Sequence, residues 1–114
     1  MLARKMLDMY LTMEELFHPD LKDISLEQVF RALGDPVRFA AIKELLANGD
    51  EAKACGTYNY TVTKATFSHH LQILRESGIL FMRLEGTRKY TSLRTKELNK
   101  RFPGLLELIK KDLR

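Results

Sequence analysis

The chain has 114 residues, a length that supports one domain with a single core and is too short for two independent domains. Apolar residues make up 45% of it and charged residues 30%, an ordinary globular composition that excludes global disorder. Residues 57–101 carry nine basic and three acidic side chains, whereas residues 1–56 have a net charge of −3; this uneven distribution is typical of a surface that meets phosphates.

The first predicted element is an amphipathic helix over residues 2–17. Its apolar side chains recur at spacings of three and four, so one face of the helix needs a partner. Acidic residues interrupt this segment where a signal peptide would be apolar, and the sequence has no apolar run of the roughly 18 to 20 residues that a membrane span requires. We therefore expect a cytoplasmic protein with no membrane partner.

A second helix is predicted over residues 25–33. Ser25 and Gln28 have the spacing of a capping box, which fixes its start. The segment "HPDLKD" before it breaks the helical pattern, and we expect His18, which precedes Pro19, to be a turn residue.

The tripeptide "GDP" separates this helix from the next one. Gly34 suits a helix end, Asp35 an N-cap and Pro36 a first helical position, so a third helix is predicted over residues 36–47. The stretch that follows gives a weaker signal. "EAKAC" indicates one or two short helical turns, and "GTYNYTV" indicates a loop.

The stretch "TKATFSHHLQILRESG" predicts a helix that begins after an N-cap at Thr63 and ends before Gly78. At 100° per residue, Phe67, Leu71 and Leu74 lie within about 60° of one another and face the core. The opposite face is small and polar, and it consists of Ala65, Ser68, His69, Gln72 and Glu76, with Lys64 and Arg75 at one margin.

A basic β-hairpin comes next. "ILFMRLE" and "RKYTSL" predict two strands joined by a tight turn at Gly86. Arg83, Arg88 and Lys89 lie near the tip of this hairpin.

The C-terminal residues predict two short helices. Thr95 is expected to cap the first, which Pro103 interrupts. The second is apolar along much of its length and contains Leu105, Leu106, Leu108, Ile109 and Leu113.

This order of elements is that of a winged helix-turn-helix, in which the second helix of the turn enters the major groove. The predicted fold class is therefore mainly α with a small β-hairpin. In the order and spacing of "LGDPVR", "SHHLQILRESGI" and "EGTRKY", the chain resembles the ArsR-type (ArsR/SmtB) family of winged-helix transcriptional regulators over roughly residues 18–113. The resemblance implies a homodimeric repressor, not an enzyme, that binds double-stranded DNA at a palindromic operator.

The resemblance also implies which side chains contact DNA. In the predicted helix 63–77 these are Lys64, Ala65, Ser68 and His69, and Thr66 and Gln72 are secondary contacts. Hydroxyl and imidazole groups bind base edges, an alanine methyl packs on thymine, and a lysine near a helix N-terminus suits a phosphate. In the hairpin, the "wing", Arg88 and Lys89 are expected to reach the DNA backbone or minor groove, with Arg83 in support.

The terminal helices are the predicted dimer interface. A monomer of this size has difficulty covering two apolar stripes, whereas a twofold dimer buries both; the alternative is that the stripes close the monomer's own core. This view divides the chain into an N-terminal helix at residues 1–17, a DNA-binding domain at residues 18–94 and a C-terminal helix at residues 95–114. The interface residues are Met6, Met9, Tyr10, Met13, Leu105, Ile109 and Leu113.

The histidine doublet does not predict metal binding or catalysis. His69 and His70 diverge by 100° on a helix, so they do not chelate one ion, and nothing nearby orients His69 as a base for Ser68. We expect His70 to be a packed histidine with one hydrogen-bonded nitrogen. No cofactor is expected.

Cys55 leaves the sensing question open. Many relatives of the resembled family that sense metals carry cysteine pairs or carboxylate and histidine pairs, and this sequence lacks both patterns. The thiol is a buried small hydrophobe, a redox sensor or a soft-metal ligand shared across a dimer. The effector is then redox, an unknown small molecule, or absent.

Two other functions remain open from the sequence. The winged helix can be a protein-interaction module, or it can be an architectural DNA binder without sequence preference. The response of binding to salt distinguishes the first, and competition with unrelated duplex distinguishes the second.

Overall fold

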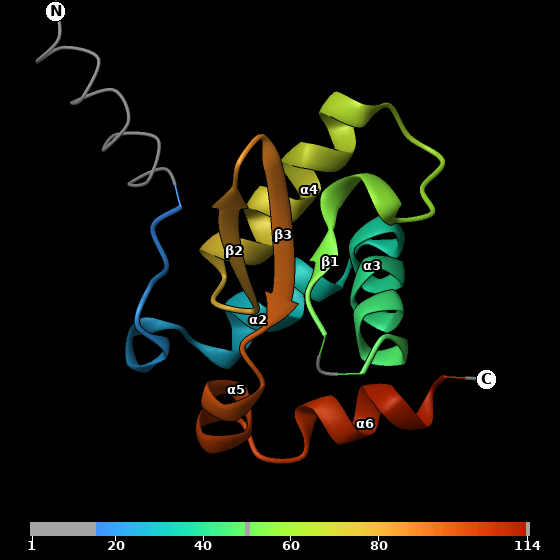
Figure 1. Cartoon of the computed structure of the whole chain (residues 1–114). Helices are drawn as coiled ribbons and strands as arrows, with labels where there is room; N and C mark the ends of the chain where they lie inside the picture. Colours follow the sequence, from blue (N-terminus) through green and yellow to red (C-terminus); the bar gives the residue numbers. More distant parts are fainter. Residues whose placement is uncertain (1–15, 50, 114) are drawn as a thin grey trace, which may run out of the picture.

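The computed structural model describes residues 16–49 and 51–113, and within them the chain forms a mainly α winged helix-turn-helix with a three-stranded antiparallel sheet, as predicted (Figure 1). The elements in chain order are η1 (Leu21–Asp23), α2 (Leu26–Leu33), α3 (Pro36–Ala47), β1 (Lys53–Ala54), η2 (Cys55–Thr57), α4 (Lys64–Glu76), β2 (Leu80–Glu85), β3 (Arg88–Leu93), α5 (Thr95–Arg101) and α6 (Leu105–Lys111).

The helix starts agree with the capping signals in the sequence. The Ser25 hydroxyl accepts a bond from the Gln28 amide at 3.1 Å, while the Gln28 side chain accepts one from the Ser25 amide at 2.8 Å. Asp35 caps α3 by accepting from the next two helical amides, and these bonds, with the amide of Arg38 first, lower the pKa of its carboxyl. Thr63 caps α4 in the same way. Each cap contributes about 1 kcal/mol to stability.

Helix α4 ends where the sequence predicts, at Gly78. This residue has a φ of +81°, which L side chains rarely adopt, and a Cβ added there would clash with the Leu21 side chain. A glycine therefore allows the chain to turn from α4 into β2 while residues 21–24 pack closely against the turn.

The sheet has the strand order β1-β3-β2, with the predicted hairpin at its centre and edge. Glu85 pairs with Arg88 around a two-residue turn, and Gly86 supplies the positive φ of +65° that this turn needs. Figure 1 shows the hairpin tip at the end of the molecule opposite α5 and α6.

Strand β1 was not predicted, and the expectation of helical turns over "EAKAC" was wrong for its first part. Lys53 pairs with Thr91 of β3, and the buried Thr91 hydroxyl donates to the Lys53 carbonyl at 2.9 Å. The Tyr58 and Thr91 hydroxyls bond at 2.7 Å, and burial raises the pKa of Tyr58. These partners lie more than thirty residues away in sequence, so local propensity did not reveal the strand.

One hydrophobic core contains residues of α2, α3, α4, β2, α5 and α6. Ile42 and Leu45 of α3 meet Leu71 and Leu74 of α4 in this core, and each of these side chains is at most 1% exposed. Burial of one such side chain contributes about 1.5 to 3 kcal/mol. Residues of the predicted C-terminal element belong to the same core, namely Leu98, Phe102, Leu106 and Ile109.

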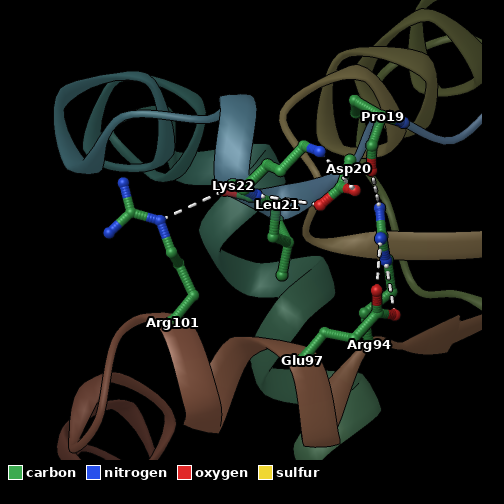
Figure 2. Close-up of polar contacts among 7 residues, drawn as sticks. All are labelled: Pro19, Asp20, Leu21, Lys22, Arg94, Glu97 and Arg101. Carbon is green, nitrogen blue, oxygen red and sulfur yellow. Dashed lines mark hydrogen bonds and ion pairs between the residues drawn. The ribbon is translucent and has the colours of Figure 1, made fainter.

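The start of α5 differs from the prediction. Thr95 is the first helical residue and the N-cap is Arg94, which makes no side-chain cap bond. Instead, the Arg94 guanidinium lies between the Glu97 carboxylate, at 2.7 and 3.0 Å, and the Pro19 carbonyl, at 2.7 Å (Figure 2). The bond from Arg94 lowers the pKa of Glu97. An ion pair with Glu97, together with a hydrogen bond to the distant Pro19 carbonyl, therefore takes the place of the expected cap.

Two side-chain expectations were also wrong because their partners are distant in sequence. Arg75 is not at the margin of an exposed face: it is 8% exposed, and its Nη1 donates to the Phe17 carbonyl at 2.6 Å. His18 is more than a turn residue, since its Nε2 accepts a bond from the Met82 amide of β2.

Across residues 16–49 and 51–113, no helix has both the length and the apolar character needed to cross a membrane.

Candidate nucleic-acid interface

Helix α4 presents the predicted polar face to solvent. Phe67, Leu71 and Leu74 are buried, which fixes the rotation of the helix. Tyr60 stacks on Phe67 with ring centroids 4.2 Å apart and holds the loop that leads into α4. The predicted contact residues of this helix are all exposed, namely Lys64, Ala65, Thr66, Ser68, His69 and Gln72.

A groove of about 610 Å³ runs between this face and the wing. Its lining brings together four of the six predicted α4 residues and one of the three predicted wing residues: Ala65, Ser68, His69, Gln72 and Lys89. Leu16 and Phe17 line its other edge, together with Met82 and Leu84. The groove is therefore polar on the helix side, where Glu76 is also present, has the basic Lys89 on the wing, and is apolar at residues 16–17.

The exposed polar side chains of α4 differ in whether they already have partners. The Gln72 amide donates to the Glu76 carboxylate at 3.1 Å, so a contact of this amide with DNA requires that bond to break. The Thr66 hydroxyl accepts from Thr63 at 2.9 Å and keeps its own proton available. Ser68 and His69 have no hydrogen bond from their side chains to any other described residue.

The wing residues differ in the same way. Arg88 and Lys89 are exposed at the start of β3, next to the Gly86 turn. Arg83 is half-buried, bonds to the Glu85 carboxylate, and places its guanidinium 4.8 Å from the centre of the Tyr90 ring. Its charge is therefore partly engaged within the wing, whereas Arg88 and Lys89 form no ion pair with a described residue.

His70 connects the two helices of the turn, as the predicted packed histidine with one bonded nitrogen. Its Nδ1 lies 3.0 Å from Arg38 Nη1 and 3.8 Å from the Asp35 carboxylate. Because a guanidinium only donates, Nδ1 carries no proton in this arrangement. Arg38 also donates to the Ala32 carbonyl at 2.6 Å, so one arginine joins α2, α3 and α4. No sequence pattern indicated this role of Arg38.

Cys55 lies half-buried in η2. Burial raises the pKa of its thiol, and the positive charge of Lys89 offsets this only in part. A raised pKa disfavours the reactive thiolate form. Within residues 16–49 and 51–113, no three side chains of the metal-ligating types gather into one cluster.

A second, apolar groove of about 510 Å³ lies between α2, the start of α3 and α6. Phe30 and Leu108 are 55% and 67% exposed beside it. Of the predicted interface residues, Leu105 and Ile109 line this groove, Ile109 as a buried side chain, and Leu113 is half-buried. Met6, Met9, Tyr10 and Met13 lie outside the described residues.

Sequence reasoning missed Phe30 and Leu108 as exposed apolar residues. Leu26 and Phe30 are four residues apart in α2 and are 44% and 55% exposed, so this i,i+4 pair was the available signal. In α6, apolar residues occur on several sides of the helix, and spacing alone did not show that Ile109 faces inward while Leu108 faces solvent.

No model of a known protein family matches the chain. Among curated proteins, it is similar to the uncharacterized HTH-type transcriptional regulator YceK of Bacillus subtilis (strain 168), with 37% identity over 84 residues that cover 72% of this chain and 83% of the relative. It is also similar to the transcriptional repressor SdpR of the same organism, with 31% identity covering 75% of this chain and 94% of the relative. A third relative is the arsenical resistance operon repressor of Bacillus subtilis, with 33% identity covering 64% of this chain and 70% of the relative.

Proposed function

The chain belongs to the ArsR-type family of helix-turn-helix transcriptional regulators, and on this premise we propose that it is a homodimeric repressor that binds a palindromic operator. As a member of this family it is a DNA-binding regulator of transcription. DNA is proposed to bind at the groove between α4 and the wing, because exposed hydrogen-bonding groups and a basic wing residue line this groove together. Its relatives are transcriptional regulators, and we infer no catalytic role.

Sequence specificity is assigned to the exposed face of α4. Ser68 and His69 bind base edges, since their side chains have no partner among the described residues and lose no internal bond on meeting DNA. Ala65 packs against a thymine methyl, and Lys64 in the first turn of α4 binds a phosphate together with the amides of the helix N-terminus. Gln72, which must first leave Glu76, and Thr66 make secondary contacts.

Affinity without sequence preference is assigned to the wing. Arg88 and Lys89 are exposed near its tip and neutralise backbone phosphates or enter the minor groove. Arg83 supports them by holding Tyr90 and Glu85 in place, and it has less charge available for DNA.

The dimer interface is assigned to the apolar groove at α2 and α6. Phe30 and Leu108 offer exposed apolar surface on both sides of it, and burying this surface against a second copy is the main driving force for association. Leu105, Ile109 and Leu113 support this surface from α6. We also retain Met6, Met9, Tyr10 and Met13 as interface candidates from their spacing. A twofold dimer presents two α4 helices, which explains the expected palindromic operator.

An effector, if the regulator has one, is a small molecule or an oxidant. Cys55 is the candidate for thiol-based sensing, although the raised pKa of its thiol lowers the thiolate fraction and so slows its reaction with an oxidant. Because the proposed function requires contact with chromosomal DNA, we infer a cytoplasmic location.

Fluorescence anisotropy of the protein with duplex DNA tests the proposal. The duplexes are the region upstream of its own coding sequence and an unrelated sequence, each over a salt series. We expect at least a tenfold preference for the upstream duplex and a log-log salt slope of about −0.9 for each neutralised phosphate. Equal binding to both duplexes would indicate an architectural DNA binder. Failure to bind either, by a folded dimer, would contradict the proposal and favour a protein-interaction module.

A further inference from the structure

Residues 17–24, which we call the strap, are held by three arginines from different parts of the chain. Each guanidinium donates to a backbone carbonyl of the strap: Arg75 to Phe17 at 2.6 Å, Arg94 to Pro19 at 2.7 Å, and Arg101 to Leu21 at 3.2 Å and Ile24 at 3.1 Å. Figure 2 shows Arg94, the N-cap of α5, and Arg101, within α5, reaching the strap. The strap is therefore fixed at several points before it enters α2.

His18 connects the strap to the wing. Its Nε2 accepts a hydrogen bond from the Met82 amide at 2.9 Å, and its ring stacks on Phe81 with centroids 4.6 Å apart. Strand β2 is at the edge of the described sheet, so this amide has no strand partner on that side. His18 supplies the acceptor that a neighbouring strand would otherwise provide.

Two consecutive strap residues thus connect the two parts of the DNA-binding groove. The Phe17 carbonyl accepts a hydrogen bond from Arg75, which is in the last turn of α4. His18 accepts one from Met82 of β2, the edge strand of the described sheet. Phe17 and Met82 also line the groove. The strap therefore contacts both α4 and the wing beside the groove.

The bond to Met82 depends on the charge of His18. An amide only donates, so Nε2 must be unprotonated and the neutral ring carries its proton on Nδ1. Arg75 of α4 and Arg94, next to α5, face the imidazole and disfavour its cation; Glu97 of α5 favours the cation but is bonded to Arg94. Burial first, then the two arginines, lowers the pKa of His18 below its ordinary value of 6.5. Strand β2 contributes no charged group to this site through Phe81 or Met82.

We propose that His18 is a positioning residue that holds the wing in its DNA-binding orientation, and that protonation of His18 releases the wing and weakens DNA binding. This inference rests on the proposed roles of α4 and the wing. Because the pKa is lowered in the folded protein, the bond stabilises the fold above about pH 6.5 and is lost as the pH falls through the lowered pKa. The predicted direction is distinctive, since protonation of a histidine near DNA ordinarily strengthens binding through its positive charge.

The test compares the wild-type protein with His18→Gln and His18→Ala. Glutamine offers an acceptor oxygen near the position of Nε2 and stays neutral at every pH, whereas alanine offers none. The first measurement is the chemical shift of the Met82 amide between pH 8 and pH 5, without DNA. We expect this resonance to titrate below pH 6.5 in the wild type and to stay constant in His18→Gln.

The second measurement is affinity for the upstream duplex at pH 7.5 and at the acid end point of the Met82 amide titration. We expect the wild type to lose about three- to tenfold relative to His18→Gln at the lower pH, as the loss of one hydrogen bond implies. His18→Ala should bind weakly at both values. His69 and His70 are present in all three proteins, so they contribute equally to each.

Two results would overturn the inference: a Met82 amide that does not titrate in the wild type, or an affinity ratio between wild type and His18→Gln that is the same at both pH values. If none of the proteins binds DNA at pH 7.5, the proposed function fails and the positioning role fails with it. The amide titration still reports the bond itself in that case, so the two failures are distinguishable.

Discussion

The two grooves of the molecule have similar sizes and different chemistry. The groove between α4 and the wing, of about 610 Å³, is lined on one side by serine, histidine and glutamine and includes a lysine. The groove at α2 and α6, of about 510 Å³, is lined mainly by phenylalanine, leucine and isoleucine. The size of a groove therefore does not determine which partner it binds. The side chains that line it do, and on this basis we propose DNA for the first groove and a second copy of the chain for the other.

The largest expected effect comes from placing a charge in the apolar groove. Leu108→Glu should raise the dimer dissociation constant at least about 100-fold, because a carboxylate would be buried in an apolar interface, and operator affinity should fall with it. Sedimentation equilibrium measures the first effect.

Phe17→Glu is the matched control, since Phe17 and Leu108 are both 67% exposed but line different grooves. This variant should remain a dimer. Dissociation of Phe17→Glu together with an intact Leu108→Glu dimer would move the interface to residues 1–17.

A smaller effect is expected from removing one base-reading side chain. His69→Ala should weaken binding to the operator by about 1 to 3 kcal/mol and change binding to an unrelated duplex very little, because only the specific complex uses a base contact. Anisotropy with both duplexes measures this difference. An equal loss on both duplexes would show that His69 contacts only the backbone.

The wing should contribute differently. Arg88→Ala should weaken binding to all duplexes alike and reduce the magnitude of the salt slope by about 1, since one phosphate contact is lost. Arg83→Ala serves as the control with an engaged guanidinium, and it should change the slope less. A larger change for Arg83→Ala than for Arg88→Ala would reverse the assigned roles.

The smallest effect is expected at Gln72. Its amide already donates to Glu76, so the contact with DNA replaces one bond with another, and Gln72→Ala should lower operator affinity by less than about threefold. Titration calorimetry of the two proteins against the operator provides the measurement. A loss as large as that of His69→Ala would place Gln72 among the main base contacts.

The sequence predicted the parts of the fold that depend on neighbouring residues. Ser25, Asp35 and Thr63 cap the helices that they were expected to cap, and Gly78 ends α4, because each acts on amides or dihedral angles within three residues of itself. The family resemblance that these motifs predicted is confirmed by the similarity of the chain to curated transcriptional regulators.

The features that the sequence did not predict depend on distant partners. Strand β1 pairs with Tyr90 and Thr91 of β3, and the roles of Arg75 and His18 depend on contacts with residues 58 and 64 positions away. The exposed face of α4 was predicted because its apolar positions follow one helical period. The exposed face of α6 was not, because leucine and isoleucine occur on several sides of that helix.

Chemical-shift mapping tests most directly whether the two grooves have separate partners. The isotope-labelled protein is titrated with the upstream duplex, and the backbone amide shifts are followed. We predict the largest changes at Ser68, His69, Arg88 and Lys89, with Phe30 and Leu108 unchanged. Large changes at Phe30 and Leu108, with none at His69, would contradict the assignment of DNA to the groove between α4 and the wing.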